Sequence, residues 1–163
     1  MNNVILVNRK DKETGEQEKF RAHIKANLHR AFSVLLFNKK GEIMLQKRSQ
    51  FKPIAPYLWS NTCCSHPRKG KDIKKEAERR LKQEMGIQCS LEESFQLYYK
   101  FRYGYFTEHE IDHVFIGKFN GKPILNKKEA CGWKWASIKE VKKDIKENPE
   151  KYTLWFGLIL EKI

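Results

Sequence analysis

Segments with the periodicity of strands and segments with the periodicity of helices follow one another in this chain without a regular alternation. Residues 4–7 (VILV) and 32–37 (FSVLLF) are apolar runs of strand length, and 42–47 (EIMLQK) follows a Lys-Gly turn, which predicts a hairpin. Residues 95–103 alternate between apolar and polar side chains, the period of a strand, and 109–119 is another strand candidate. The chain therefore has to build a β-sheet.

The strongest helix candidate covers residues 72–85. Its apolar side chains recur every four positions from Ile73 to Met85. Asp72 can cap the first turn and Gly86 can end the last one. This segment predicts an amphipathic helix that lies on the sheet.

Two further helices are predicted near the C-terminus. One starts at the capping box Ser137-Ile138-Lys139-Glu140 and ends before Pro149, and the other is the apolar segment 153–162. Neither an internal repeat nor a Pro/Gly/Ser-rich linker divides the sequence. We therefore expect one α/β (α+β) domain over residues 1–163, with helices covering a mixed sheet.

Charge and composition narrow the classes of partner. The 163 residues carry 33 Lys+Arg against 20 Asp+Glu, a formal net charge of +13. This excess favours anionic partners, but zinc-finger spacing and the other common nucleic-acid motifs are missing, and many lysines are scattered over helical segments as solvated surface. A basic nucleic-acid-binding protein remains the alternative from another class, for which steep salt dependence of binding would be the mark.

The sequence also bears on location. It has no apolar run near the roughly 20 residues that a membrane span needs and no export signal at its start. Of its four cysteines, Cys63 and Cys64 are adjacent, which makes a poor disulfide ring. We expect a cytoplasmic protein with reduced thiols.

Residues 59–70 (WSNTCCSHPRKG) crowd two thiols and an imidazole together just before the predicted helix. A cysteine beside a histidine and a helix N-terminus can be reactive. A cytosolic cysteine is also commonly a small buried hydrophobe. The residues by themselves leave both interpretations open.

Residues 108–112 (EHEID) lie at the start of a predicted strand. Glu108 and Glu110 would share one face, with about 6.6 Å between their Cα atoms. Two like charges at that spacing suit a divalent cation, although a solvated edge strand needs none. With three further imidazoles the pair could form an octahedral nitrogen and oxygen site for Mn, Mg or Zn; the histidines are His23, His29 and His66.

Several runs of the chain closely resemble one known family. They are 28-LHRAFSVLLFN-38, 45-LQKRS-49, 61-NTCCSHP-67, 79-RRLKQEMGI-87 and 107-TEHEID-112. In order and spacing they are similar to type I isopentenyl-diphosphate isomerase, over about residues 4–157. The resemblance implies the Nudix fold, a mixed β-sheet sandwiched between helices, with residues 72–85 as the Nudix helix.

The Nudix box itself is degenerate. When Gly86-Ile87 is aligned with the end of G-x₅-E-x₇-R-E-U-x-E-E-x-G-U, Lys71, Arg80 and Gln83 stand where glutamates are expected, and Glu84 remains. A Nudix-type diphosphate hydrolase uses those carboxylates to hold metal ions. Hydrolysis is therefore the weaker alternative and isomerisation the stronger.

The resemblance implies roles for individual residues. It makes Cys64 and Glu110 the acid and base that move the double bond of isopentenyl diphosphate through a tertiary carbocation to give dimethylallyl diphosphate. Tyr103 would complete the proton path near Glu110, and the indole of Trp155 would face the cation.

The resemblance also implies a set of ligands. One divalent ion (Mn²⁺, Zn²⁺ or Mg²⁺) would be held by His23, His29, His66, Glu108 and Glu110. Glu84 would help to hold Mg²⁺ against the diphosphate. The diphosphate itself would contact Lys19, Arg48, Lys52, Ser65 and Arg80. We expect a small-molecule diphosphate substrate, no flavin, no nucleic acid, no membrane span, and a monomer or weak dimer.

Overall fold

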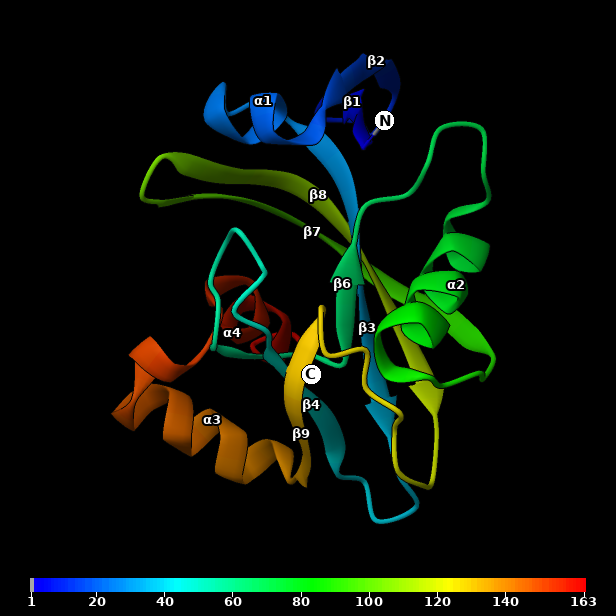
Figure 1. The fold of residues 1–163 in the computed structure, drawn as a ribbon, viewed down its shortest axis with the longest axis vertical. Coiled ribbons are helices and arrows are strands. Elements are labelled where there is room, and N and C mark those ends of the chain that lie inside the picture. Colours follow the sequence, from blue (N-terminus) through cyan, green and yellow to red (C-terminus); the bar gives the residue numbers. More distant parts are fainter. Residues whose placement is uncertain (1) are drawn as a thin grey trace.

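The computed structural model describes residues 2–163, and a mixed β-sheet occupies its centre (Figure 1). Strand β3 (His29–Phe37) is the hub of this sheet. It pairs in parallel with β8 (Phe106–Lys118), from His29 opposite Glu110 to Phe37 opposite Lys118, and antiparallel with β6 (Cys63–Ser65). This register brings the start of β3 beside the Glu108–Asp112 segment.

The remaining strands extend the sheet through antiparallel pairs. β1 pairs with β2 and contacts β3, β7 pairs with β8, and β4 pairs with β5 and β9. Their bounds are β1 Asn3–Val7, β2 Glu13–Glu18, β4 Ile43–Arg48, β5 Trp59–Ser60, β7 Leu91–Tyr103 and β9 Ala130–Ala136.

The predicted hairpin at Lys40-Gly41 is confirmed, and two strands that the sequence predicts separately pair as a second hairpin. β3 and β4 are joined at Lys40-Gly41, where Gly41 takes a left-handed φ of +75°. The segments 95–103 and 109–119 form one long hairpin, β7–β8, which turns at Gly104 with a φ of +57°. β8 begins earlier than predicted, at Phe106, so the EHEID segment lies inside a strand.

Helix α2 (Ile73–Met85) begins and ends where the sequence predicts. The Asp72 carboxylate accepts a hydrogen bond from the Lys75 amide at 2.9 Å, and Gly86 ends the helix with a φ of +67°. Its apolar side chains Ala77, Leu81 and Met85 are fully buried in one cluster with Phe32 and Val34 of β3, and Ile73 is partly buried at its edge.

Helices α3 (Ile138–Glu147) and α4 (Leu154–Leu160) cover the opposite side of the sheet, with a short 3₁₀ turn at Pro149–Lys151 between them. The predicted capping box at Ser137 is present. On this side Leu35 of β3 packs with α4 side chains. The sheet thus lies between helices, as predicted.

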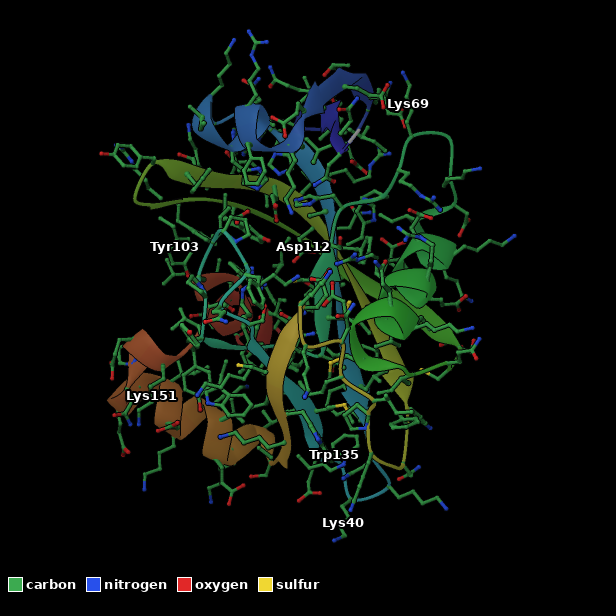
Figure 2. The ribbon with its side chains drawn as sticks, in the orientation of Figure 1. Lys40, Lys69, Tyr103, Asp112, Trp135 and Lys151 are labelled. Atoms are coloured by element: carbon green, nitrogen blue, oxygen red, sulfur yellow. The ribbon has the colours of Figure 1, made fainter. Side chains whose placement is uncertain are left out.

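One short helix was not predicted. α1 (Lys19–Ile24) has six residues, too few for a readable period, and is capped by the Glu18 carboxylate, which accepts from the amides of Phe20 and Arg21. No helix within residues 2–163 is long and apolar enough to cross a membrane. Figure 2 places Asp112 in the interior and Lys40, Lys69 and Lys151 at the edges of the molecule.

Candidate active site

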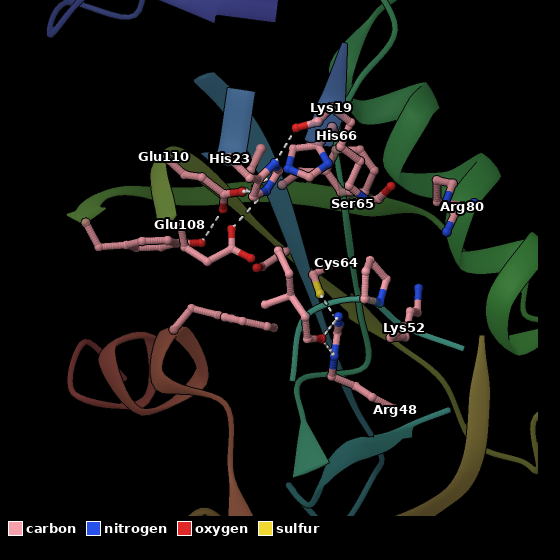
Figure 3. A pocket seen from close by; sticks show the side chains of 17 residues that line it. Lys19, His23, Arg48, Lys52, Cys64, Ser65, His66, Arg80, Glu108 and Glu110 are labelled. Atoms are coloured by element: carbon pink, nitrogen blue, oxygen red, sulfur yellow. Dashed lines mark hydrogen bonds and ion pairs between the residues drawn. The ribbon is translucent and has the colours of Figure 1, made fainter. Parts of the chain in front are cut away.

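A cavity lies between α1, the β7–β8 hairpin, β6 and the loop after β4 (Figure 3), and its empty space is about 550 Å³ when the solvent at its mouth is included. All but three of the predicted site residues line it. The lining members are Lys19, His23, Arg48, Lys52, Cys64, Ser65, His66, Arg80, Glu108, Glu110 and Trp155. His29, Glu84 and Tyr103 lie outside the lining.

The three predicted histidines converge on Glu110 at one end of the cavity. One ligand atom each from His23, His29, His66 and Glu110 lies within 4.8 Å of all the others. Glu110 Oε1 is 3.1 Å from His29 Nε2, 2.8 Å from His66 Nε2 and 4.0 Å from His23 Nε2. Four separate elements, α1, β3, the segment after β6 and β8, supply these side chains.

The cluster has the donor set and orientation that a divalent cation needs. The Nδ1 atoms of His23 and His29 contact the carbonyl oxygens of Lys19 (2.7 Å) and Asn27 (2.8 Å). An Nδ1–H that donates to a carbonyl orients Nε2 toward the cluster, where that nitrogen can bind a cation once it has lost its proton, the arrangement usual for metal-bound imidazoles. His23 Nε2 is buried and makes no hydrogen bond with any atom of residues 2–163, although Glu108 Oε2 lies 3.4 Å away. These observations fit a divalent ion.

Electrostatics within the cluster separates the two glutamates. Burial and repulsion from Glu110 raise the pKa of Glu108. Burial would also raise the pKa of Glu110, but the hydrogen bond and charge of His29 outweigh it and lower that pKa to about 2. Burial, followed by repulsion from Lys19, holds the pKa of His66 well below its usual value, so that ring is neutral. Burial opposes protonation of His23, but the Glu108 carboxylate raises its pKa.

Strand β6 sends its two cysteines to opposite faces. Cys63 is fully buried in the cluster that packs under α2, whereas Cys64 lines the cavity. Burial raises the pKa of Cys64 to about 11, although the charge of Arg48 opposes the shift. Arg48 Nη1 lies 3.5 Å from Cys64 Sγ. At neutral pH Cys64 is therefore a thiol beside a guanidinium that can stabilise its thiolate.

Arg48 and Lys52 line the cavity at the end away from the histidines, which we call the cationic end, and Lys19 lies closer to His66 (Figure 3). Arg48 is fixed by the loop that follows it, because its Nε and Nη2 atoms donate to the Ile54 carbonyl at 3.2 and 2.8 Å. Burial, and then repulsion from Lys52, lower the pKa of Lys19. An anionic ligand would relieve this repulsion, so the arrangement suits a phosphate group.

Arg80 and Lys52 meet two carboxylates at the edge of this cationic region. Arg80 Nη2 donates to Glu84 Oε1 at 2.5 Å and to Glu129 Oε1 at 3.1 Å. Lys52 Nζ pairs with Glu129 Oε2 and lies 3.7 Å from Glu84 Oε1. The buried Glu84 also accepts from Gln46 Nε2 at 3.0 Å.

The tyrosine whose hydroxyl contacts Glu110 is Tyr99. The Tyr99 hydroxyl donates to Glu110 Oε2 at 2.6 Å, and burial raises its pKa well above the usual value. The Tyr103 hydroxyl instead accepts a hydrogen bond from the Leu154 amide at 2.9 Å. Tyr99 pairs with Glu110 and Tyr103 with Phe106 in the hairpin register. Four residues of strand separate the tyrosines by about 13 Å.

Trp155 lines the cavity from α4 and is held on several sides. Its Nε1–H points toward Ser60 Oγ (3.1 Å) and Asn61 Oδ1 (3.2 Å), and its ring stacks on Phe101 with centroids 6.4 Å apart. The Arg48 guanidinium lies 5.1 Å from the ring centroid. The indole face is therefore fixed beside the cavity.

Sequence reasoning missed three site residues. Tyr99 could have been found from the hairpin register, since a turn at Gly104 places it opposite Glu110. Asp112 continues the period-two face of Glu108 and Glu110; burial and repulsion from Glu110 raise its pKa to about 8. Glu129 lies in a loop and carries no local signal.

Known proteins resemble this chain over most of its length. A model of the NUDIX domain matches residues 27–156. The chain is 42% identical to isopentenyl-diphosphate Delta-isomerase 2 of Aromatoleum aromaticum over 161 residues, covering 98% of this chain and 85% of that protein. It is 40% identical to isopentenyl-diphosphate Delta-isomerase of Pectobacterium atrosepticum, covering 98% and 90%.

Solved structures with lower identity share the fold. A crystal structure from Deinococcus radiodurans superimposes with a TM-score of 0.78 at 16% identity and covers 98% of both chains. The MutT protein of Methanosarcina mazei gives a TM-score of 0.69 at 19% identity, covering 83% of this chain and 91% of that one. These similarities confirm the predicted fold, a mixed sheet between helices.

Proposed function

We propose, from the premise that the chain belongs to the type I isopentenyl-diphosphate isomerase family within the Nudix fold, that it converts isopentenyl diphosphate to dimethylallyl diphosphate. One observation carries this function. Cys64 and Glu110 line the same cavity, the first with its pKa raised and the second with its pKa lowered. A proton donor and an ionised acceptor thus line one cavity.

The reaction needs such a pair because an isolated alkene is a very weak base. The Cys64 thiol transfers its proton to the terminal methylene carbon, which becomes a methyl group and leaves a tertiary carbocation. Glu110 takes a proton from the carbon between the cation and the diphosphate-bearing carbon, and the new double bond forms there. Arg48, 3.5 Å from Cys64 Sγ, stabilises the thiolate.

Two aromatic residues support the intermediate. The fixed indole of Trp155 offers a π-face to the cation and cannot trap it as a nucleophile. Tyr99 orients Glu110 through its 2.6 Å hydrogen bond and takes the place near Glu110 that the resemblance gave to Tyr103. We retain Tyr103 as a packing partner of Trp155, whose ring it meets edge-on at 6.2 Å.

Two divalent cations belong to the proposal. His23, His29, His66, Glu108 and Glu110 would hold Mn²⁺, Zn²⁺ or Mg²⁺. The histidine arrangement supports this, as does the buried His23 Nε2, which has no hydrogen-bond partner in the described part of the chain. When bound, such a cation neutralises the repulsion between the two carboxylates.

The diphosphate would occupy the cationic end of the cavity and contact Arg48, Lys52, Ser65 and Arg80, with Lys19 reaching it from the side of His66. Glu84, beside Lys52 and Arg80, would hold Mg²⁺ against the phosphate oxygens. We propose that residues 1–163 act as one catalytic domain, cytoplasmic and monomeric or weakly dimeric, without flavin or nucleic acid.

A single incubation tests this function. The purified protein is mixed with isopentenyl diphosphate and Mg²⁺ in deuterated water and followed by proton and phosphorus NMR. We expect dimethylallyl diphosphate that carries deuterium in its new methyl group, because the thiol proton exchanges with solvent. Release of phosphate without the allylic isomer would identify a hydrolase and refute the proposal.

A further inference from the structure

Two acidic and two basic side chains form a closed, alternating group behind the cationic end of the cavity. Each cation contacts both carboxylates: Arg80 reaches Glu84 and Glu129 at 2.5 and 3.1 Å, and Lys52 pairs with Glu129 and lies 3.7 Å from Glu84. All four side chains are at most 18% exposed. Their formal charges sum to zero, so the two cations that face the cavity are neutralised from behind.

Glu129 is held firmly in this position by its backbone. Its amide donates to the Asn126 carbonyl at 2.8 Å, and its carbonyl accepts from the Ser49 amide at 3.1 Å. The Asn126 amide in turn donates to the carbonyl of Glu84 at 2.9 Å. The turn at residues 126–129 therefore connects the end of α2 to the loop after β4, and the Glu129 carboxylate lies between the two.

The group leaves one donor free. Arg80 Nε is buried and has no hydrogen-bond partner within residues 2–163, although Arg80 lines the cavity. An unpaired buried N–H is costly, and a phosphate oxygen is a strong acceptor for it. Arg80 is therefore only partly satisfied by its internal carboxylates.

We propose that Glu129 is an internal counter-anion that competes with the substrate diphosphate for Lys52 and Arg80, and so makes diphosphate binding depend on Mg²⁺. This inference rests on the proposed function, because it assigns these two cations to a diphosphate. Binding then requires an exchange of partners, in which the phosphate oxygens replace the carboxylate of Glu129. Mg²⁺ favours the exchange by supplying positive charge to the carboxylates that lose their partners.

The test measures the binding of inorganic pyrophosphate by calorimetry, with and without excess Mg²⁺. In Glu129→Gln the competing charge is gone, while the amide oxygen still accepts from Arg80. We expect metal-free pyrophosphate to bind at least about threefold more tightly than to the unaltered chain, since one like charge near the ligand is removed. The gain in affinity on adding Mg²⁺ should shrink by a similar factor.

The control is Glu147→Gln on α3, which changes the net charge equally but removes only an exposed carboxylate. It should leave both affinities unchanged. Equal metal-free affinity in Glu129→Gln and the unaltered chain, or weaker binding with a lower melting temperature, would overturn the proposal and leave Glu129 a structural residue. If the unaltered chain isomerised its substrate but showed no Mg²⁺ effect on pyrophosphate binding, only this inference would fail.

Discussion

Adjacent substitutions at Cys63 and Cys64 separate chemistry from packing. Both side chains belong to β6, at neighbouring positions in the register against β3, but they project to opposite faces of the strand. Cys64 reaches the cavity, and Cys63 is packed under α2 with no exposed surface. Each replacement with alanine removes one sulfur atom, from the cavity wall at Cys64 and from the core at Cys63.

Cys64→Ala removes the proton donor. With its pKa raised to about 11, the thiol is almost fully protonated at neutral pH and available as an acid. A positioned general acid typically contributes about 10²–10⁴-fold, which corresponds to about 3–5 kcal/mol of activation free energy. Because water is a poor acid toward an alkene, we expect a loss at the upper end, about 10⁴-fold in kcat. Pyrophosphate affinity should change little.

Cys63→Ala removes a buried atom about as large as a methyl group from the cluster that contains Leu81 and Met85. Loss of one such group costs about 1 kcal/mol of unfolding free energy when the site does not collapse. For a chain of this size that lowers the melting temperature by about 2–4 °C. Activity per folded molecule should stay within about twofold of the unaltered chain.

The assay pairs turnover with thermal melting on the same two proteins. Isomer formation is followed by NMR at substrate saturation, and the melting temperature is taken from circular dichroism. Equal loss of turnover in the two variants at full folding would show that the second cysteine has no special role. Substantial turnover by Cys64→Ala would refute the assignment of the acid.

Four further predictions follow from named contacts. His29→Ala should reduce bound divalent metal and turnover together, measured by elemental analysis and NMR, and unchanged metal content would contradict the cluster. Tyr99→Phe should lower kcat at least about tenfold and Tyr103→Phe much less, since only Tyr99 bonds Glu110; the reverse order would restore Tyr103 to the proton path. Trp155→Phe should retain part of the turnover and Trp155→Leu lose most of it; a stable, fully active leucine variant would remove the indole from the mechanism. Hydrogen bonds from arginine lower the pKa of Glu76 to about 2 against the opposing effect of burial. The ionised carboxylate therefore stabilises the fold fully above the unfolded pKa of 4.5, and this stabilisation is lost as the pH falls toward 2. Glu76→Gln should reduce the difference in unfolding free energy between pH 6 and pH 3 by up to about 2 kcal/mol, measured by urea unfolding.

The elements with local signals were predictable. α2 carries a period, an N-cap at Asp72 and a terminal Gly86, and each acts over a few residues whatever the rest of the chain does. Alternation predicted the strand at 95–103, which is part of β7, but not its pairing with β8. α1 was not, because six residues give no period and its stability depends on packing against the sheet.

The site needed long-range geometry that spacing does not contain. Tyr103 was assigned from a local F-R-Y match, whereas the contact to Glu110 is decided by the pairing register, which places Tyr99 opposite it. Glu129 reaches Lys52 only because a turn ties the end of α2 to the loop after β4, across 77 residues of sequence. The family resemblance identified most of the residues that line the cavity, whereas the strand register and the loop contacts determine the positions of Tyr99 and Glu129.

Cys64, the proposed acid, and Glu110, the proposed base, are both buried, and their pKa values shift in opposite directions because their charged neighbours differ. Burial raises the pKa of any acidic group, and at Cys64 one guanidinium at 3.5 Å does not cancel it. At Glu110 the imidazoles of His29 and His66, at 3.1 and 2.8 Å, surround the carboxylate, and the charge and hydrogen bond of His29 reverse the effect. At rest the proton therefore remains on sulfur and the carboxylate stays ionised. Burial also keeps Asp112, two residues further along β8, largely protonated at neutral pH. Asp112 therefore adds little negative charge beside the ionised Glu110.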